Sequence, residues 1–221
     1  MTDHDAVDLL LQHSTFGDDP YGGFLERSKS EGLPPIAVSP VYGRLLEILV
    51  RLVNASLIVE VGTLGGYSAA WMARAMAPAG RLVTLEIDLH HADVARANLD
   101  DAKLGANVDI RVGPALTSLD AMMGDTSING LVDLSFIDAD KANNPNYLDR
   151  LATLARPGGL IVVDNVVRSG GILDGASADP NIIGSRDVLA ALGRHPRLVA
   201  TAMQTVGIKG HDGFAIAYVA S

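Results

Sequence analysis

Phe136-Ile137-Asp138-Ala139-Asp140-Lys141 is the stretch from which the fold can be read. It directly follows an apolar run, residues 131–135, that predicts a buried strand. A second apolar run, residues 160–163, ends in the same way, in Asp164-Asn165, and residues 144–156 between the two runs have the length of one helix. Because a strand–helix–strand crossover makes its two strands parallel, Asp138, Asp164 and Asn165 should meet at the carboxyl edge of the sheet.

Oxygen side chains that meet at such an edge predict a metal site. Neighbouring strands lie about 5 Å apart, so Asp138, Asp164 and Asn165 can converge on one ion. Carboxylate and amide oxygens suit Mg²⁺, our first choice, or Mn²⁺ or Ca²⁺, better than they suit zinc. The alternative is that each acid is a helix cap or a solvated loop residue. We favour the metal site because the acids occur together at both strand ends.

The composition limits the kind of protein and of partner. The chain has 221 residues, and we expect one domain, 1–221, with accessory helices in residues 1–35 and the core in residues 36–221. Its 17 Lys and Arg against 26 Asp and Glu give a net charge of −9, which argues against a nucleic-acid partner. The absence of cysteine excludes disulfides, thiolate catalysis and Cys-based zinc sites.

The chain also lacks the pattern of a secretory leader after Met1 and any apolar run near the roughly 18 residues of a membrane span. We therefore expect a cytoplasmic protein that makes no membrane contact.

The other patterns predict an α/β fold whose seven-stranded sheet is mostly parallel, with helices on both faces. The predicted strands are residues 57–61, 81–86, 108–112, 131–135, 160–163, 198–204 and 214–219. The predicted helices are residues 6–13, 20–32, one starting at Ser39-Pro40, 67–76, 90–103, one opened by Gly113-Pro114-Ala115, 144–156 and 183–192. The glycine-rich residues 207–213 form a loop short enough to favour an antiparallel hairpin at the C-terminal edge.

The turn after the first strand predicts a nucleoside site. Its pattern, Glu60-x-Gly62-x-x-Gly65-Gly66, lacks the Gly-x-Gly of dinucleotide folds. The Glu60 carboxylate would repel a pyrophosphate and attract the ammonium group of S-adenosylmethionine. Glu86, which ends the second strand, can accept hydrogen bonds from ribose hydroxyls. The alternative is that the glycines only shape a tight turn, but the two acids together favour a nucleoside cofactor.

These motifs together resemble the cation-dependent O-methyltransferases typified by the caffeoyl-coenzyme A and catechol enzymes, and above all their small bacterial members. The resemblance covers residues 38–219 and is most specific in residues 60–68, 113–116, 136–141 and 164–165. It implies the Rossmann-like fold of class I S-adenosylmethionine-dependent methyltransferases. It also implies methyl transfer from S-adenosylmethionine to a hydroxyl of a small catechol-like or phenolic acceptor.

The resemblance further implies a role for each motif residue. Asp138, Asp164 and Asn165 would bind the divalent cation, Lys141 would be the general base, and Asp138 would belong to the catalytic residues as well. The implied cofactor contacts are Val38, Glu60, Gly62, Thr63, Ser68, Glu86, Ala115 and Asp138. The first two helices, which diverge most, would help to shape the acceptor pocket. We expect a homodimer, because those helices and the hairpin tip offer surfaces beyond the sheet.

The expected mechanism is an in-line displacement at the methyl group. A neutral phenol must first lose its proton, and a divalent cation at Asp138, Asp164 and Asn165 would promote that loss. A neighbouring cation would also favour the free amine of Lys141, which could then act as the base. The alternative is that Lys141 is a surface lysine or forms an ion pair with Asp140.

Other functions and other residues remain open at this point. A hydroxylated tRNA base could be the acceptor. A nicotinamide oxidoreductase would need the missing Gly-x-Gly motif. If the protein were a non-catalytic nucleoside-binding protein, the presence of Lys141 would be unexplained. We interpret His90-His91 as a solvated helix face, His211 as a loop residue and Trp71 as a core residue.

Overall fold

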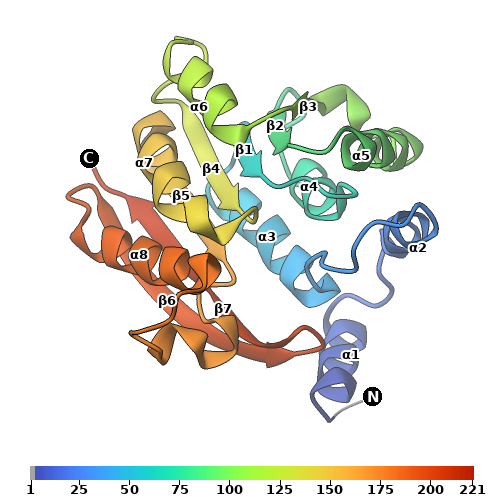
Figure 1. Cartoon of the computed structure of the whole chain (residues 1–221). Coiled ribbons are helices and arrows are strands. Elements are labelled where there is room, and N and C mark those ends of the chain that lie inside the picture. Colours follow the sequence, from blue (N-terminus) through green and yellow to red (C-terminus); the bar gives the residue numbers. More distant parts are fainter. Residues whose placement is uncertain (1–2) are drawn as a thin grey trace.

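Residues 3–221 are described by the computed structural model, in which one sheet runs through the middle of the chain (Figure 1). Its strand order is β3-β2-β1-β4-β5-β7-β6. The parallel strands are β1 (Leu57–Val61), β2 (Arg81–Glu86), β3 (Val108–Val112), β4 (Val132–Ile137) and β5 (Ala155–Asp164). Strand β7 (Gly210–Val219) is antiparallel to β5, and β6 (Leu198–Gly207) is antiparallel to β7. The predicted sheet and its antiparallel edge are therefore confirmed.

Helices cover both faces of this sheet. They are α1 (Asp3–Thr15), α2 (Gly22–Ser30), α3 (Pro40–Leu52), α4 (Tyr67–Ala73), α5 (Leu89–Asp101), α6 (Ala115–Met123), α7 (Asn144–Leu154) and α8 (Pro180–Arg194), with short 3₁₀ turns η1 (Gly105–Asn107), η2 (Lys141–Asn143) and η3 (Arg168–Leu173). Side chains alternate along each strand, so the inner strands β1, β2, β4, β5 and β7 contribute to two cores. Val59 packs with α6, α7 and α8, whereas Ile58 packs with α3, α4 and α5. Trp71 is fully buried in the second core, as predicted.

The register of β4 and β5 positions the acidic strand ends. Ile137 pairs with Val163, so the next residues, Asp138 and Asp164, lie side by side. The backbone N–H of Asp138 donates to Val61 O of β1 at 2.8 Å. A Cβ at Gly62 would lie 2.4 Å from the carbonyl oxygen of Asp138, and Gly62 has a φ of +102°. Only glycine allows both the conformation and this close approach.

The C-terminal hairpin is longer than predicted. Residues 207–213 were expected to form its loop, but the strands pair as far as Gly207 and Gly210 and leave only Ile208 and Lys209 between them. The ladder needs only backbone groups, so glycine does not interrupt it, and Gly210 reverses the chain with a φ of +84°. Helix α1 reaches this tip, where the Asp8 carboxylate accepts a hydrogen bond from the Ile208 N–H at 2.8 Å.

The N-terminal helices pack on the same core. The Tyr21 and Trp71 rings meet edge to face with centroids 5.4 Å apart, and Phe24 is buried beside Tyr21. None of the helices described between residues 3 and 221 combines the length and the apolar composition that a membrane crossing requires. The cytoplasmic location stays a prediction.

Helix α8 contacts the backbone at Lys141, and this contact yields a stability prediction. A Cβ at Gly184 would lie 2.0 Å from the carbonyl oxygen of Lys141, whereas a Cβ at Gly193 of the same helix meets nothing within 4 Å. We expect Gly184→Ala to lower the free energy of unfolding by about 1–3 kcal/mol, the usual cost of overpacking. Gly193→Ala should change it little or raise it, because alanine favours a helix by up to about 1 kcal/mol. Urea denaturation of both variants tests this, and equal stabilities would contradict it.

Candidate active site

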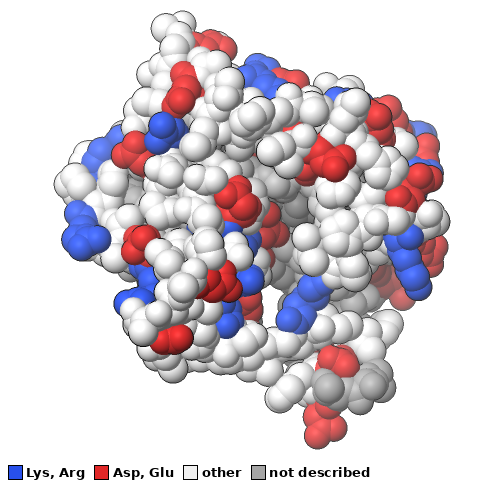
Figure 2. All heavy atoms as spheres, viewed as in Figure 1, with Lys and Arg blue, Asp and Glu red and all other residues white. Residues whose placement is uncertain are grey.

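Two adjoining cavities open at the carboxyl edge of the sheet, and the space-filling view shows a deep hollow in the middle of this face (Figure 2). The first has a volume of about 730 Å³ and the second about 580 Å³. Residues 36–38 and Asn165 line both cavities, so the two share a wall. The first cavity is lined by nine of the predicted site residues: Val38, Gly62, Thr63, Ser68, Glu86, Ala115, Asp138, Lys141 and Asn165. Asp164 lines the second cavity, and Glu60 lines neither.

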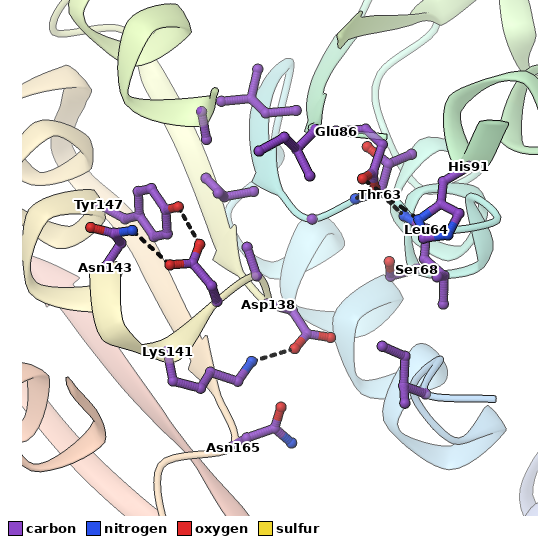
Figure 3. A pocket seen from close by; sticks show the side chains of 18 of the residues that line it. Thr63, Leu64, Ser68, Glu86, His91, Asp138, Lys141, Asn143, Tyr147 and Asn165 are labelled. Carbon is purple, nitrogen blue, oxygen red and sulfur yellow. Dashed lines mark hydrogen bonds and ion pairs between the residues drawn. The ribbon is translucent and has the colours of Figure 1, made fainter. Parts of the chain in front are cut away.

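Lys141 and the two acids form a compact charged group where the cavities meet. The Lys141 side chain is only 7% exposed, and its Nζ lies 2.7 Å from Oδ1 of Asp138 (Figure 3). Burial, and next the negative charge of Asp138, raise the pKa of Asp164 to about 8. A second negative charge beside Asp138 is therefore unfavourable in this poorly solvated place unless a cation balances it.

The donor atoms at this place fit a hard divalent cation. No ion pair within 4.0 Å joins the Asp164 carboxylate to a Lys, Arg or His among residues 3–221, although it is buried beside another acid. Asn165 has a φ of +56°, a left-handed conformation that asparagine tolerates better than most residues. The described residues contain no cluster of three or more His, Cys, Asp or Glu suited to a metal. A cation here would therefore need the Asn165 amide oxygen beside the two carboxylates.

Asp140 is not the partner of Lys141. Its carboxylate accepts hydrogen bonds from the Tyr147 hydroxyl and the Asn143 amide, on the other side of the loop from Lys141 (Figure 3). The alternative of an ion pair between Lys141 and Asp140 was therefore wrong. These two hydrogen bonds anchor the loop and leave Lys141 directed at Asp138.

Glu86 lies on the opposite side of the first cavity and holds the glycine turn. Its carboxylate accepts hydrogen bonds from the N–H groups of Thr63 at 3.2 Å and Leu64 at 2.8 Å (Figure 3). It also accepts one from the N–H of Asp88 at 3.0 Å. A carboxylate has about four acceptor positions, so one remains for a ligand in the cavity. Glu86 can thus shape the turn and bind a hydroxyl group at the same time.

Glu60 is fully buried behind the cavity wall. It accepts hydrogen bonds from Ser68 Oγ and Thr84 Oγ1, each at 2.6 Å. Burial raises the pKa of Glu60 to about 8, although both hydroxyls oppose this shift. Ser68 lines the cavity in front of Glu60. A direct contact between Glu60 and a cofactor stays a prediction. In the structure, Glu60 contacts the cavity only through the Ser68 hydroxyl among the hydrogen-bond partners named above.

Sequence reasoning gave no site role to several residues that line the cavities, among them His91 and Tyr42. His91 was expected on a solvated face, but it lines the first cavity, with its Nδ1 3.7 Å from Oε1 of Glu86. The Asp88 carboxylate caps α5 by accepting hydrogen bonds from the N–H groups of His90 and His91, a helix start that can be read from the sequence. His90 is exposed, as predicted. The prediction that His211 is a loop residue was wrong, because His211 lies in β7, where it pairs with Val206 and contacts Gln204.

Tyr42 of α3 is another of these residues. Its ring stacks on Phe214 with centroids 5.2 Å apart and lines the second cavity. Its hydroxyl is buried without a hydrogen-bond partner among the described residues. Burial, and then the charges of Asp164 and Asp138, raise the pKa of Tyr42 well above its usual value. Tyr42 lies three residues after the Ser39 cap. Nothing in the neighbouring sequence distinguishes it from the residues of α3 that pack in the core.

Comparison with known proteins agrees with this geometry. The family model described as O-methyltransferase matches residues 24–216. A catechol O-methyltransferase of Mycobacterium tuberculosis is 48% identical over 214 residues, which cover 96% of this chain and 94% of that protein. A catechol O-methyltransferase of Niastella koreensis is 43% identical over 217 residues, 98% of this chain and 96% of that protein.

Solved structures show the same similarity. An O-methyltransferase from Bacillus cereus, in complex with SAH, has a TM-score of 0.94 and 42% identity, covering 98% of each chain. An O-methyltransferase from Streptomyces achromogenes involved in tomaymycin synthesis, in complex with SAM, has a TM-score of 0.94 and 36% identity, covering 100% of each chain. These findings leave no support for a nicotinamide oxidoreductase. The predicted resemblance is confirmed, and the chain belongs to the O-methyltransferase family.

Proposed function

We propose that residues 1–221 form a single domain that transfers a methyl group from S-adenosylmethionine to one hydroxyl of a catechol-like acceptor, with a divalent cation at the site. The observation that carries the proposal is the ion pair of the buried Lys141 with Asp138 at the junction of two cavities. Two cavities suit a reaction between two small molecules. The relatives named catechol O-methyltransferase support the acceptor class, and the neighbours solved with SAH and SAM support the cofactor.

The first cavity would hold the cofactor. Glu86 has an acceptor position left for a ribose hydroxyl, and Ser68 and Asp138 lie towards the other end of the cavity. Val38, Gly62, Thr63 and Ala115 would complete the contacts. Glu60 would act as a positioning residue by fixing the Ser68 hydroxyl from behind. The methyl group would then point towards Asp138 and the second cavity.

The acceptor would enter the second cavity with its hydroxyl beside Lys141. The hydroxyl oxygen attacks the methyl carbon in line with the leaving sulfur, so a C–O bond forms and a C–S bond breaks. The sulfonium becomes a neutral thioether, and the hydroxyl proton passes to the lone pair of Lys141 Nζ, which takes part as the free amine. Two hydroxyls on adjacent carbons would align one oxygen for attack while the second contacts Asn165 or Asp164.

Asp138, Asp164 and Asn165 would hold the divalent cation. When bound, it would acidify the acceptor hydroxyl and offset the negative charge of the two carboxylates. The pKa of Asp164, raised by burial and by Asp138, supports a cation at this place. Mg²⁺ remains the first choice, and Mn²⁺ or Ca²⁺ would suit the same oxygen donors.

Metal removal tests the acceptor class and the cation together. Labelled S-adenosylmethionine should transfer its methyl group to catechols in the presence of Mg²⁺ or Mn²⁺. EDTA should abolish this transfer, and added Mg²⁺ should restore it. Bulk tRNA is the comparison acceptor and should remain unlabelled, because the chain has a net charge of −9. Full activity in EDTA would disprove the metal site, and labelled tRNA would favour the other acceptor.

Replacement of Lys141 tests the base. We expect Lys141→Ala to lower kcat by roughly 10²- to 10⁴-fold and to leave cofactor binding nearly unchanged. Rising pH should restore part of the rate, because the acceptor then ionises without a base. Asp164→Ala should differ, since excess Mg²⁺ can repopulate a weakened site by mass action. Lys29→Ala, at an exposed lysine of α2, is the control. A Lys141→Ala enzyme with normal kcat at neutral pH would refute the base.

We also propose a homodimer. Edge strand β6 exposes Val199, Met203 and Val206, and the neighbouring α1 exposes Val7 and Leu10. An unprotected edge strand with apolar side chains suits pairing or packing with a second copy. Light scattering should give about twice the 23.1 kDa of one chain. Val206→Glu should shift the mass towards one chain, and a wild-type protein that scatters as a monomer would disprove the dimer.

A further inference from the structure

The second cavity has a reactive end and an apolar middle. Asp164 and Asn165 lie at the reactive end, next to Asp138 and Lys141 of the adjoining cavity. Its middle is lined by Ile36, Val38, Leu45, Phe214 and the ring of Tyr42. Such walls suit an aromatic ring, whose hydroxyls would lie at the reactive end.

The charged groups that line this cavity are not equally available to a ligand. Arg44 donates to Glu47 at 2.8 Å and lies over the Phe16 ring. The Asp212 carboxylate accepts hydrogen bonds from the N–H groups of Val167 at 3.1 Å, Arg168 at 2.9 Å and Gly213 at 3.0 Å. Asp8 accepts from the Ile208 N–H at the hairpin tip. Among the described residues of this cavity, Lys209 is the cation that has no carboxylate within ion-pair distance.

Lys209 is anchored in the wall of the second cavity. It lies in the two-residue loop of the hairpin, and its Nζ donates to the carbonyl oxygen of Pro35 at 3.0 Å. An ammonium group has three donors, so two remain. Pro35 directly precedes residues 36–38, which line both cavities. The Lys209 ammonium is therefore anchored next to the wall that the two cavities share.

Lys209 lines the same cavity as Asp164 and lies outside ion-pair distance of it. Burial lowers the pKa of Lys209, and the charges of Asp138 and Asp164 oppose this shift. Lys209 is therefore close enough to feel both acids, yet it forms no ion pair with either. An aromatic ring between the acids and the ammonium would have its hydroxyls at one end and a cation at the other.

We propose that Lys209 selects acceptors that carry a carboxylate, so that the preferred substrate is a dihydroxylated aromatic acid rather than a neutral or cationic catechol. This inference rests on the proposed function and deepens it. The carboxylate would take the two free donors of the Lys209 ammonium, while the hydroxyls lie beside Lys141. A charge-assisted hydrogen bond of this kind favours the acid over a neutral analogue of the same shape.

The test compares three acceptors of similar shape: 3,4-dihydroxybenzoate, the corresponding benzyl alcohol and the corresponding benzylamine. With saturating S-adenosylmethionine and Mg²⁺, the wild type should show its highest kcat/KM on the acid. Lys209→Met keeps the length of the side chain and removes its charge. It should lower kcat/KM on the acid by roughly 10- to 100-fold, as expected for a hydrogen bond to a charged group. The value on the alcohol should stay nearly constant.

Controls keep this inference distinct from the proposed function. Lys209→Arg should retain a preference for the acid, and Lys29→Met at an exposed lysine should match the wild type. Unchanged binding of S-adenosylmethionine shows that Lys209→Met is folded. Two results would overturn this inference and leave the proposed function standing. One is wild-type activity on all three acceptors without preference for the acid. The other is an equal loss of kcat/KM on all three acceptors in Lys209→Met. No methylation of any of the three by the wild type would overturn the proposed function with it.

Discussion

Two carboxylates held side by side at adjacent strand ends are the constraint on which the site depends. The parallel register of β4 and β5 places Asp138 next to Asp164, and neither can move away without breaking strand pairing. Their repulsion and their burial show in the raised pKa of Asp164. One amine, Lys141, offsets part of the negative charge. The sheet therefore supplies the free energy that keeps a strained set of charges together, as is common where chemistry is performed.

The glycine turn after β1 and the loop after β4 are parts of one rigid unit. Gly62 touches the backbone of Asp138 closely enough to exclude a side chain. Behind the turn, the hydroxyls of Thr63 and Thr84 lie 2.6 Å apart, and Thr84 donates to the buried Glu60. A network that is satisfied in this way leaves few alternative arrangements for the residues in front of it. Such a unit can hold a methyl donor in line with an acceptor, which is the main requirement of a displacement reaction.

The second cavity is assembled from segments far apart in the chain. Helix α1, residues 36–38, α3 and the C-terminal hairpin all contribute to it, and the Asp8 carboxylate joins α1 to the hairpin tip. These segments lie outside the parallel strands that carry the cofactor turn and the acids. Their side chains can therefore change without disturbing the reacting groups, as is usual for specificity on a shared scaffold. The acceptor preference that we infer for Lys209 belongs to this variable layer.

The sequence by itself determined the sheet, the helices on its faces and the meeting of Asp138, Asp164 and Asn165. These features follow from apolar runs, helix starts and crossover handedness, which are local or topological signals. Tertiary structure decided which partners the side chains take. Lys141 pairs with Asp138 instead of Asp140, Glu60 lies behind Ser68, and His91 turns into the cofactor cavity. The position of Lys209 also depended on the unexpected length of the hairpin. Such contacts join residues on different elements, and their geometry is set by packing and burial, which the spacing of residues along one chain does not encode.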